Sequence, residues 1–305
     1  MPRGIILLCG LCLASVSHAQ DLAPRAYVIT PVHANAITIT WAFYHGGVDF
    51  NGTVPIGNAT GTYYVPIFSY YHSLNFFGRS ANITVSLPYA VGNFQGNVSG
   101  QSRSIYRSGL LDSSLRFSVN LIGGPAMQPK EMAKWKQKRL LGVSLKVVAP
   151  TGQYSGTKLV NWGSNRWAFK PELGYSESWG HWVLDGYAGV WFYTTNQASY
   201  AGPVTKSQSE APIGSLEGHL SYDVKPRLWL SLDGNFWRGG ITSLSGIQNL
   251  ATEQTGSRVG GTASFPISKH QSIKLSYSNG TYIRFGGNYQ SVSVAWQYSW
   301  LCRPK

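Results

Sequence analysis

The end of the chain alternates between two kinds of side chain over eleven residues. In QSVSVAWQYSW, residues 290–300, valine, tryptophan and tyrosine take every second place, and small or polar residues fill the gaps. Because successive side chains leave opposite faces of a β-strand, this pattern predicts a strand with one apolar and one polar face. Two folds fit: a soluble sandwich, with the apolar face toward a core, or a membrane barrel, with that face toward lipid.

Segments of the same kind recur along the chain, and their number is even, as in bacterial outer-membrane barrels. The predicted strands cover residues 37–43, 62–74, 82–87, 114–121, 141–147, 166–178, 181–193, 216–222, 228–236, 259–265, 273–277 and 290–300. Short turns follow the second, sixth, eighth and tenth of these, whereas most other connections are long and rich in Gly, Asn and Ser. Alternating short periplasmic turns and long external loops favour the barrel.

One connection, residues 122–138, is long where a short turn is expected. Its PKEMAKWKQKR stretch fits a small amphipathic helix under the periplasmic rim or a solvated charged loop, and the loop is favoured. We therefore expect an all-β fold: a closed antiparallel transmembrane β-barrel of about 12 strands.

The start of the chain has the features of a secretory signal. Residues 1–19 combine Arg3, an apolar stretch and a Ser-His-Ala cleavage site, which predicts export and cleavage after Ala19. The mature chain then keeps a single cysteine, Cys302, so no internal disulfide can form. We expect residues 20–35 to be an N-terminal lead or a plug, residues 36–301 the barrel, and residues 302–305 a C-terminal tail.

The alternation also assigns each charged residue to a face, because a charge facing lipid at the membrane centre costs about 2 to 4 kcal/mol. The predicted lumen-lining residues are Arg116, Lys146, Lys170, Glu172, Asp185, Tyr187, Trp191, Glu217, His219, Trp229, Asp233, Arg258 and Lys274. The predicted lipid-facing aromatic girdle comprises Trp41, Trp182, Trp296, Tyr298 and Trp300. A lining of both signs argues against strong ion selectivity, and its aromatic rings fit packing of the interior better than stacking of planar solutes.

The sequence holds no GxSxG, HExxH or Walker motif, and no CxxC after residue 19, so we expect no enzyme, no cofactor and no metal site. A hydrolase at the membrane interface remains an alternative, with His45, His72, His181 and His270 near strand ends as candidates. The net charge of +13 is scattered, and the predicted export excludes a nucleic-acid partner.

Several long motifs resemble one family. Residues 150–191, PTGQYSGTKLVNWGSNRWAFKPELGYSESWGHWVLDGYAGVW, together with PRAYVITP near the start and the final VAWQYSW, are similar to the putative MetA-pathway of phenol degradation family of bacterial outer-membrane proteins. The resemblance implies a transporter-like barrel encoded near genes for the breakdown of aromatic compounds, and it assigns no catalytic residue.

The expected function is passive uptake of small aromatic or hydrophobic compounds across the outer membrane. The expected partners are outer-membrane lipid, the barrel-assembly machinery and a small-molecule solute. A non-conducting structural or surface-binding barrel is the alternative from a different class.

Overall fold

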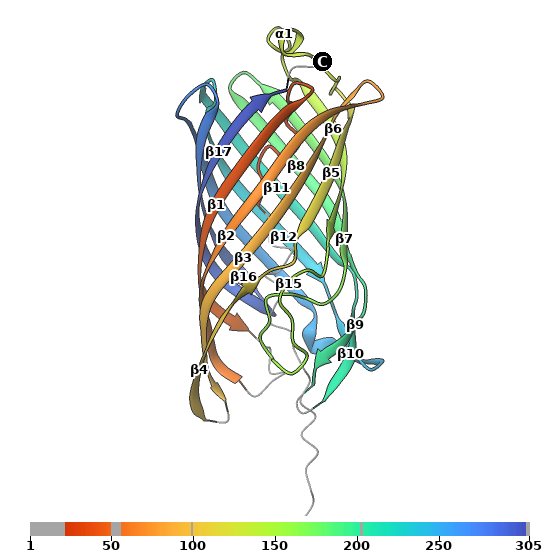
Figure 1. Ribbon diagram of the computed structural model, residues 1–305, viewed down its shortest axis with the longest axis vertical. Helices are drawn as coiled ribbons and strands as arrows, with labels where there is room; N and C mark the ends of the chain where they lie inside the picture. Colours follow the sequence, from red (N-terminus) through yellow and green to blue (C-terminus); the bar gives the residue numbers. More distant parts are fainter. Residues whose placement is uncertain (1–21, 50–55, 99, 202–203, 303–305) are drawn as a thin grey trace, which may run out of the picture.

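The computed structural model describes residues 22–49, 56–98, 100–201 and 204–302, so the predicted signal peptide at residues 1–19 lies outside the described residues. Within these ranges, twelve antiparallel strands close into a barrel (Figure 1). In chain order they are β1 (Ala34–Asp49), β2 (Ile56–Phe76), β3 (Arg79–Val98), β5 (Ser114–Ile122), β6 (Arg139–Val148), β7 (Ala168–Trp179), β8 (Trp182–Tyr193), β11 (Ile213–Lys225), β12 (Leu228–Gly239), β15 (Gln254–Pro266), β16 (Gln271–Ile283) and β17 (Gly286–Leu301). The predicted fold class is confirmed.

The barrel closes where the first strand meets the last. β17 pairs with β1 in an antiparallel register that sets Val294 opposite Trp41 and Trp296 opposite Ile39. All four of these side chains are at least one-third exposed on the outer face, while Ala295 between them is buried on the inner face. The alternation in the last strand therefore separates lipid from lumen, and closure leaves no strand edge bare in hydrocarbon.

At the end of the barrel with the long loops, further strands extend the wall. β4 (Gln101–Leu110) pairs with the distal half of β3, and β9 (Asn196–Tyr200), β10 (Thr205–Glu210), β13 (Thr242–Leu244) and β14 (Ile247–Asn249) form a second sheet, followed by the 3-10 turn η2 (Leu250–Thr252). The sequence predicted loops here, which is wrong for these stretches. These stretches lack the long apolar alternation of the barrel strands, and pairing with neighbouring strands forms them.

The connection at residues 122–138 lies at the opposite end, beside the short turns (Figure 1). It carries one helical turn, α1 (Pro129–Met132). Met132 and Trp135 pack against a buried cluster of Ile29, Met127 and Leu140. The charged side chains of the segment are exposed, as in the favoured loop, but the loop is not wholly solvated, because Met132 and Trp135 pack at the end of the lumen.

No helix among the described residues is long and apolar enough to span a membrane.

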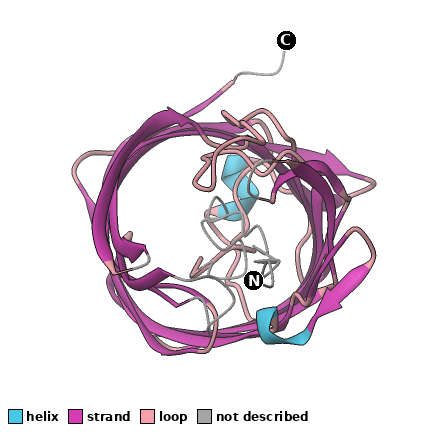
Figure 2. Ribbon diagram, turned by 90° about the horizontal axis from the view of Figure 1, so that it is seen from below, coloured by secondary structure: helices cyan, strands magenta, loops and turns pink. Residues whose placement is uncertain are grey.

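Residues 22–33, here called the lumenal segment, precede β1 and lie inside the ring of strands (Figure 2). Near β1 the segment is held by backbone bonds: the Val32 amide donates to the carbonyl of Met127 at 2.9 Å, and the His33 amide donates to that of Ser73 at 3.1 Å. From there it runs into the barrel, where Tyr27 and Ile29 are each only 1% exposed. The segment thus fills part of the space that the strands enclose.

Candidate functional site

The lumenal segment is anchored to the inner wall by Tyr27. The Tyr27 hydroxyl lies 3.0 Å from Ser144 Oγ on β6 and donates to Glu172 Oε1 on β7 at 3.0 Å. Its ring lies over Gly142 and Gly174, where a β-carbon would overlap the ring atoms. Two glycines on neighbouring strands therefore form the recess that accepts the aromatic ring.

Backbone atoms on either side of Tyr27 are also bound by side chains of the wall. The Arg25 amide donates to Asp185 Oδ2 at 3.3 Å, and the Ala26 amide donates to the Tyr187 hydroxyl at 3.0 Å. Asn120 Nδ2 donates to the Tyr27 carbonyl at 3.2 Å. A buried backbone group without a hydrogen-bond partner raises the free energy of the folded state, so these bonds lower the cost of burying the extended segment inside the barrel.

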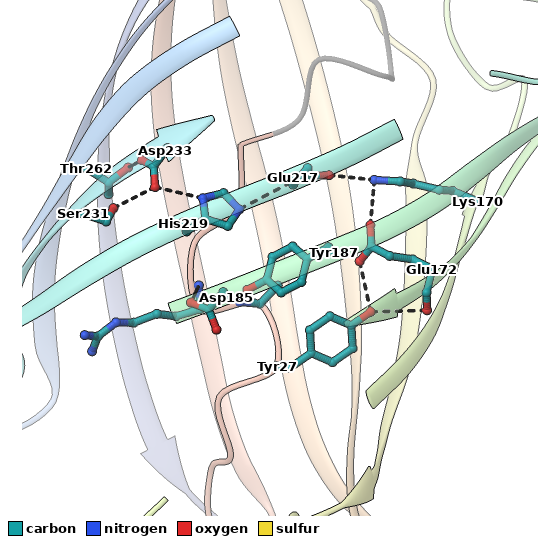
Figure 3. A network of polar contacts seen from close by, with 12 residues as sticks. Tyr27, Lys170, Glu172, Asp185, Tyr187, Glu217, His219, Ser231, Asp233 and Thr262 are labelled. Atoms are coloured by element: carbon teal, nitrogen blue, oxygen red, sulfur yellow. Dashed lines mark hydrogen bonds and ion pairs between the residues drawn. The ribbon is translucent and has the colours of Figure 1, made fainter. Parts of the chain in front are cut away.

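The same wall holds a chain of buried ionic contacts (Figure 3). Lys170 Nζ on β7 lies 2.7 Å from Glu172 and 2.9 Å from Glu217 on β11. Glu217 lies 3.7 Å from His219 Nε2, and His219 Nδ1 lies 2.9 Å from Asp233 Oδ1 on β12. Charges on this side of the lumen are therefore paired with one another, as buried charges must be.

Two cavities remain on the other side of the lumenal segment. The first, of about 250 Å³, is lined by β1, β2, β12, β15, β16 and β17 and by Leu22. The second, of about 1120 Å³, opens toward the short-turn end and is lined by the same side of the barrel, by residues 24–30 and by the connection that carries α1. Lys274 and Ala295 line both cavities, so the two cavities adjoin at these residues. We call the two cavities together the passage.

The passage is strongly cationic. Among the described residues that line it, six are Lys or Arg and two are Asp; they are Arg25, Lys136, Lys225, Arg227, Arg258, Lys274, Asp223 and Asp233. Asp223 pairs with Arg25 at 2.8 Å. Asp233 accepts hydrogen bonds from Ser231 and Thr262 in addition to its contact with His219. Both signs are present, as the sequence predicts, but cations outnumber carboxylates along the passage.

The structure places the predicted lining residues on the inner face but divides them into two sets. Trp229, Asp233, Arg258 and Lys274 line the passage. The others gather on the opposite wall with the lumenal segment or with one another; they are Arg116, Lys146, Lys170, Glu172, Asp185, Tyr187, Trp191, Glu217 and His219.

The predicted girdle residues lie on the outer face. Trp41, Trp182, Trp296 and Tyr298 are between 36% and 54% exposed. Tyr298 stacks on Trp300 with ring centroids 5.8 Å apart, and Trp182 packs against Tyr222. Their assignment to an interfacial girdle stays a prediction, which rests on the preference of amphipathic aromatic side chains for the membrane interface.

Sequence reasoning missed Tyr27, its glycine recess and the tyrosines of the smaller cavity. Tyr44 and Tyr63 stack with ring centroids 4.8 Å apart, and Tyr289 meets Tyr63 edge-on at 5.1 Å. Tyr44 and Tyr289 follow the polar phase of the predicted strands or their continuation, so extending the alternation toward the long loops would have found them. No local pattern marks Tyr27, because its partners lie on distant strands.

The four candidate histidines lie apart and make separate contacts. His45 bonds to Thr62, His72 to Asn35, His181 to the Asp223 carbonyl and His270 to the Ser299 carbonyl. None of these four hydrogen-bond partners is a carboxylate, so these contacts do not form the base and orienting acid of a catalytic triad. The described residues contain no group of three His, Cys, Asp or Glu side chains that could hold a metal ion.

A closed antiparallel barrel with an apolar exterior, a polar interior and a chain segment folded into its lumen defines an outer-membrane β-barrel. The chain belongs to the family described as putative MetA-pathway of phenol degradation, whose model matches residues 46–293. The resemblance drawn from the sequence motifs is thereby confirmed.

Solved structures share the fold at low sequence identity. The COG4313 outer membrane channel from Pseudomonas putida F1 is 15% identical, with a TM-score of 0.75, over 92% of this chain and 100% of that one. The β domain of the Bordetella autotransporter BrkA is 11% identical, with a TM-score of 0.52, over 88% of this chain and 100% of that one. The transport unit of the autotransporter AIDA-I from Escherichia coli is 12% identical, with a TM-score of 0.52, over 94% of this chain and 95% of that one. A comparison with curated proteins finds no match.

Proposed function

We propose that this protein is a channel for the passive uptake of small solutes across the outer membrane, and that solutes move along the passage. The observation that carries the proposal is the pair of cavities that adjoin at Lys274 and Ala295 along one side of the lumen. Channel function in the structurally similar Pseudomonas protein supports it. Residues 1–19 direct export in this proposal, and the barrel-assembly machinery inserts the mature chain.

A pair of tryptophan substitutions tests this route. Ser293 lines the smaller cavity, whereas the next residue, Val294, is 45% exposed on the outer face. Ser293→Trp places a large ring in the passage and is expected to lower conductance in planar bilayers by half or more. Val294→Trp adds the same ring toward lipid and is expected to leave conductance unchanged. Heat-dependent mobility on gels controls for folding of both variants.

Wild-type protein that neither conducts nor admits sugars in liposome swelling would instead indicate a non-conducting barrel. Such a barrel would act through its external loops, which is the alternative that composition also allows. An equal loss of conductance in Ser293→Trp and Val294→Trp would mean that solutes do not move along the passage.

One feature of the wall favours a second route for apolar solutes. The ladder between β7 and β8 lacks the pairs at Lys170 and Pro171, because proline has no amide hydrogen to donate. A hollow of about 690 Å³ lies there, lined by outward-facing Leu173, Ala188 and Val190 and reaching inner residues such as Ser144. An apolar solute could exchange with lipid at this point.

Uptake of 1-N-phenylnaphthylamine into intact cells distinguishes the routes. If this apolar probe uses the hollow, its uptake continues in cells that carry Ser293→Trp, while small ions are excluded. If Ser293→Trp stops both, a single route through the passage serves both kinds of solute.

A further inference from the structure

The charges and rings of the smaller cavity indicate which solutes the passage selects. Lys274 faces this cavity and the larger one, and within the described part of the chain it forms no ion pair. The nearest carboxylate on the cavity wall, Asp233, is already engaged by His219, Ser231 and Thr262. The junction of the two cavities therefore carries a lysine that no carboxylate contacts directly among the described residues.

A second cation lies further toward the long-loop end. Arg258 on β15 is 3% exposed, and its Nη1 donates to Ser278 Oγ at 2.9 Å. Arg258 and Lys274 both line the smaller cavity, which also carries the hydroxyls of Thr262, Ser276 and Ser291. Cations flanked by hydroxyl donors form charge-assisted hydrogen bonds with a carboxylate.

The same cavity presents aromatic surfaces. Tyr44 and Tyr63 are almost parallel, with an interplanar angle of 12°, and Tyr289 stands at 86° to Tyr63. All three line the cavity together with Arg258. Tyr63 itself is only 2% exposed and packs against Phe94 and Trp162, so the ring surface left for a solute belongs to Tyr44 and Tyr289. Aromatic rings gain from offset stacking and edge-to-face contacts, so these two rings can contact a planar organic group while the cations contact its anionic end.

Size restricts the solute further. The cavity of about 250 Å³ is smaller than the roughly 300 to 1,000 Å³ typical of sites for drug-sized ligands. A molecule with one ring and one carboxylate is in the range that fits. Beyond the junction, Lys136, Lys225 and Arg227 line the larger cavity, so an anion leaving Lys274 meets further positive charge on its way to the short-turn end.

We propose that the passage selects small aromatic carboxylates, with Lys274 at the junction of the cavities as the residue that determines selectivity for anions. The inference rests on the proposed channel function and adds the substrate class. Arg258, Tyr44 and Tyr289 form the binding position on the long-loop side of the junction, and Lys274 transfers the carboxylate to the larger cavity. Neutral aromatic molecules lack the anionic group that these cations bind, and aromatic cations are repelled.

Reversal potentials of the full-length protein in planar bilayers test this selectivity. Under bi-ionic conditions at neutral pH, potassium benzoate, potassium acetate and benzylammonium chloride are each compared with potassium chloride. The expected result is preference for anions over cations, and a benzoate permeability at least equal to that of the smaller acetate. Tyr289→Leu is expected to lower the permeability of benzoate relative to acetate.

Lys274→Gln is expected to lower benzoate permeability relative to potassium about tenfold, as the loss of one charge-assisted hydrogen bond would do. Lys274→Arg keeps the charge and is expected to retain the preference. Lys146→Gln is the matched control, because it removes an inner-face lysine that lies over Trp191, outside the passage.

The outcomes separate the inference from the function on which it rests. Conductance in potassium chloride with no preference for benzoate over benzylammonium would overturn the inference and leave the channel in place. An equal loss of benzoate permeability in Lys274→Gln and Lys146→Gln would also overturn the inference, because the charge at the junction would then have no special role. No conductance in any salt would remove the channel function itself.

Discussion

Single residues decide where the lumenal segment lies. Tyr27 fits its wall because Gly142 and Gly174 carry no side chain, and because Ser144 and Glu172 bind its hydroxyl group. The guanidinium of Arg116 covers the ring, with its carbon 4.8 Å from the ring centroid. One aromatic side chain thus receives packing, hydrogen-bond and cation–π contacts from three strands.

A methyl group at residue 174 therefore tests the anchor. Gly174→Ala is expected to displace the Tyr27 ring, loosen the lumenal segment and raise the single-channel conductance or its fluctuations. Gly186→Ala on β8 is the matched control, since a β-carbon there meets no atom within 4 Å. Single-channel recordings that are identical for the two variants would contradict the assigned role of Tyr27.

At the scale of elements, buried ion pairs join β7, β11 and β12 behind the lumenal segment. Lys170 lies between Glu172 and Glu217, and all three side chains are less than 10% exposed. Removing one partner of a buried ionic contact leaves an uncompensated charge, which costs about 3 to 5 kcal/mol. The network therefore fixes the spacing of these strands on the paired side of the lumen.

Lys170→Met is expected to destabilise the barrel by an amount of that order, about 3 kcal/mol, measured as a fall in the denaturant midpoint of detergent-refolded protein. The control is Arg139→Met, which breaks a solvent-exposed pair with Glu177 at the barrel end and is expected to have little effect. A similar small effect for both substitutions would mean that solvent screens the Lys170 network.

The strands of the barrel could be predicted from the sequence because each strand needs an apolar face toward lipid and a polar face toward the lumen. β4, β9 and β10 could not, since backbone pairing at the end of a hairpin requires no alternation. The sequence could not decide whether the lumenal segment folds into the barrel or extends from it, for a different reason. Its partners, such as Glu172 and Asp185, lie on strands more than a hundred residues away, and no pattern within residues 22–33 encodes their position.

At the scale of the whole molecule, the lumenal segment divides the barrel interior into two halves of different charge. On one half, Lys170, Glu172, Glu217 and His219 neutralise one another. On the other half, cations outnumber carboxylates along the passage. Alternation assigned these residues to the inner face. It could not say which of them lie against the lumenal segment and which line the cavities, because that depends on the side of the lumen that the segment covers. The sequence therefore predicted both signs in the lining but not the gathering of cations on the side of the two cavities.

The most direct measurement of this division is the reaction of single cysteines with an anionic methanethiosulfonate reagent during bilayer recording, in a Cys302→Ala background. Ser276 lines the smaller cavity, whereas Ser118 is 2% exposed on β5 between Arg116 and Asn120, which bond to the lumenal segment. We expect rapid modification of Ser276→Cys with a fall in current, and slow or absent modification of Ser118→Cys. Faster reaction at Ser118→Cys, or modification of Ser276→Cys without loss of current, would contradict this division of the lumen.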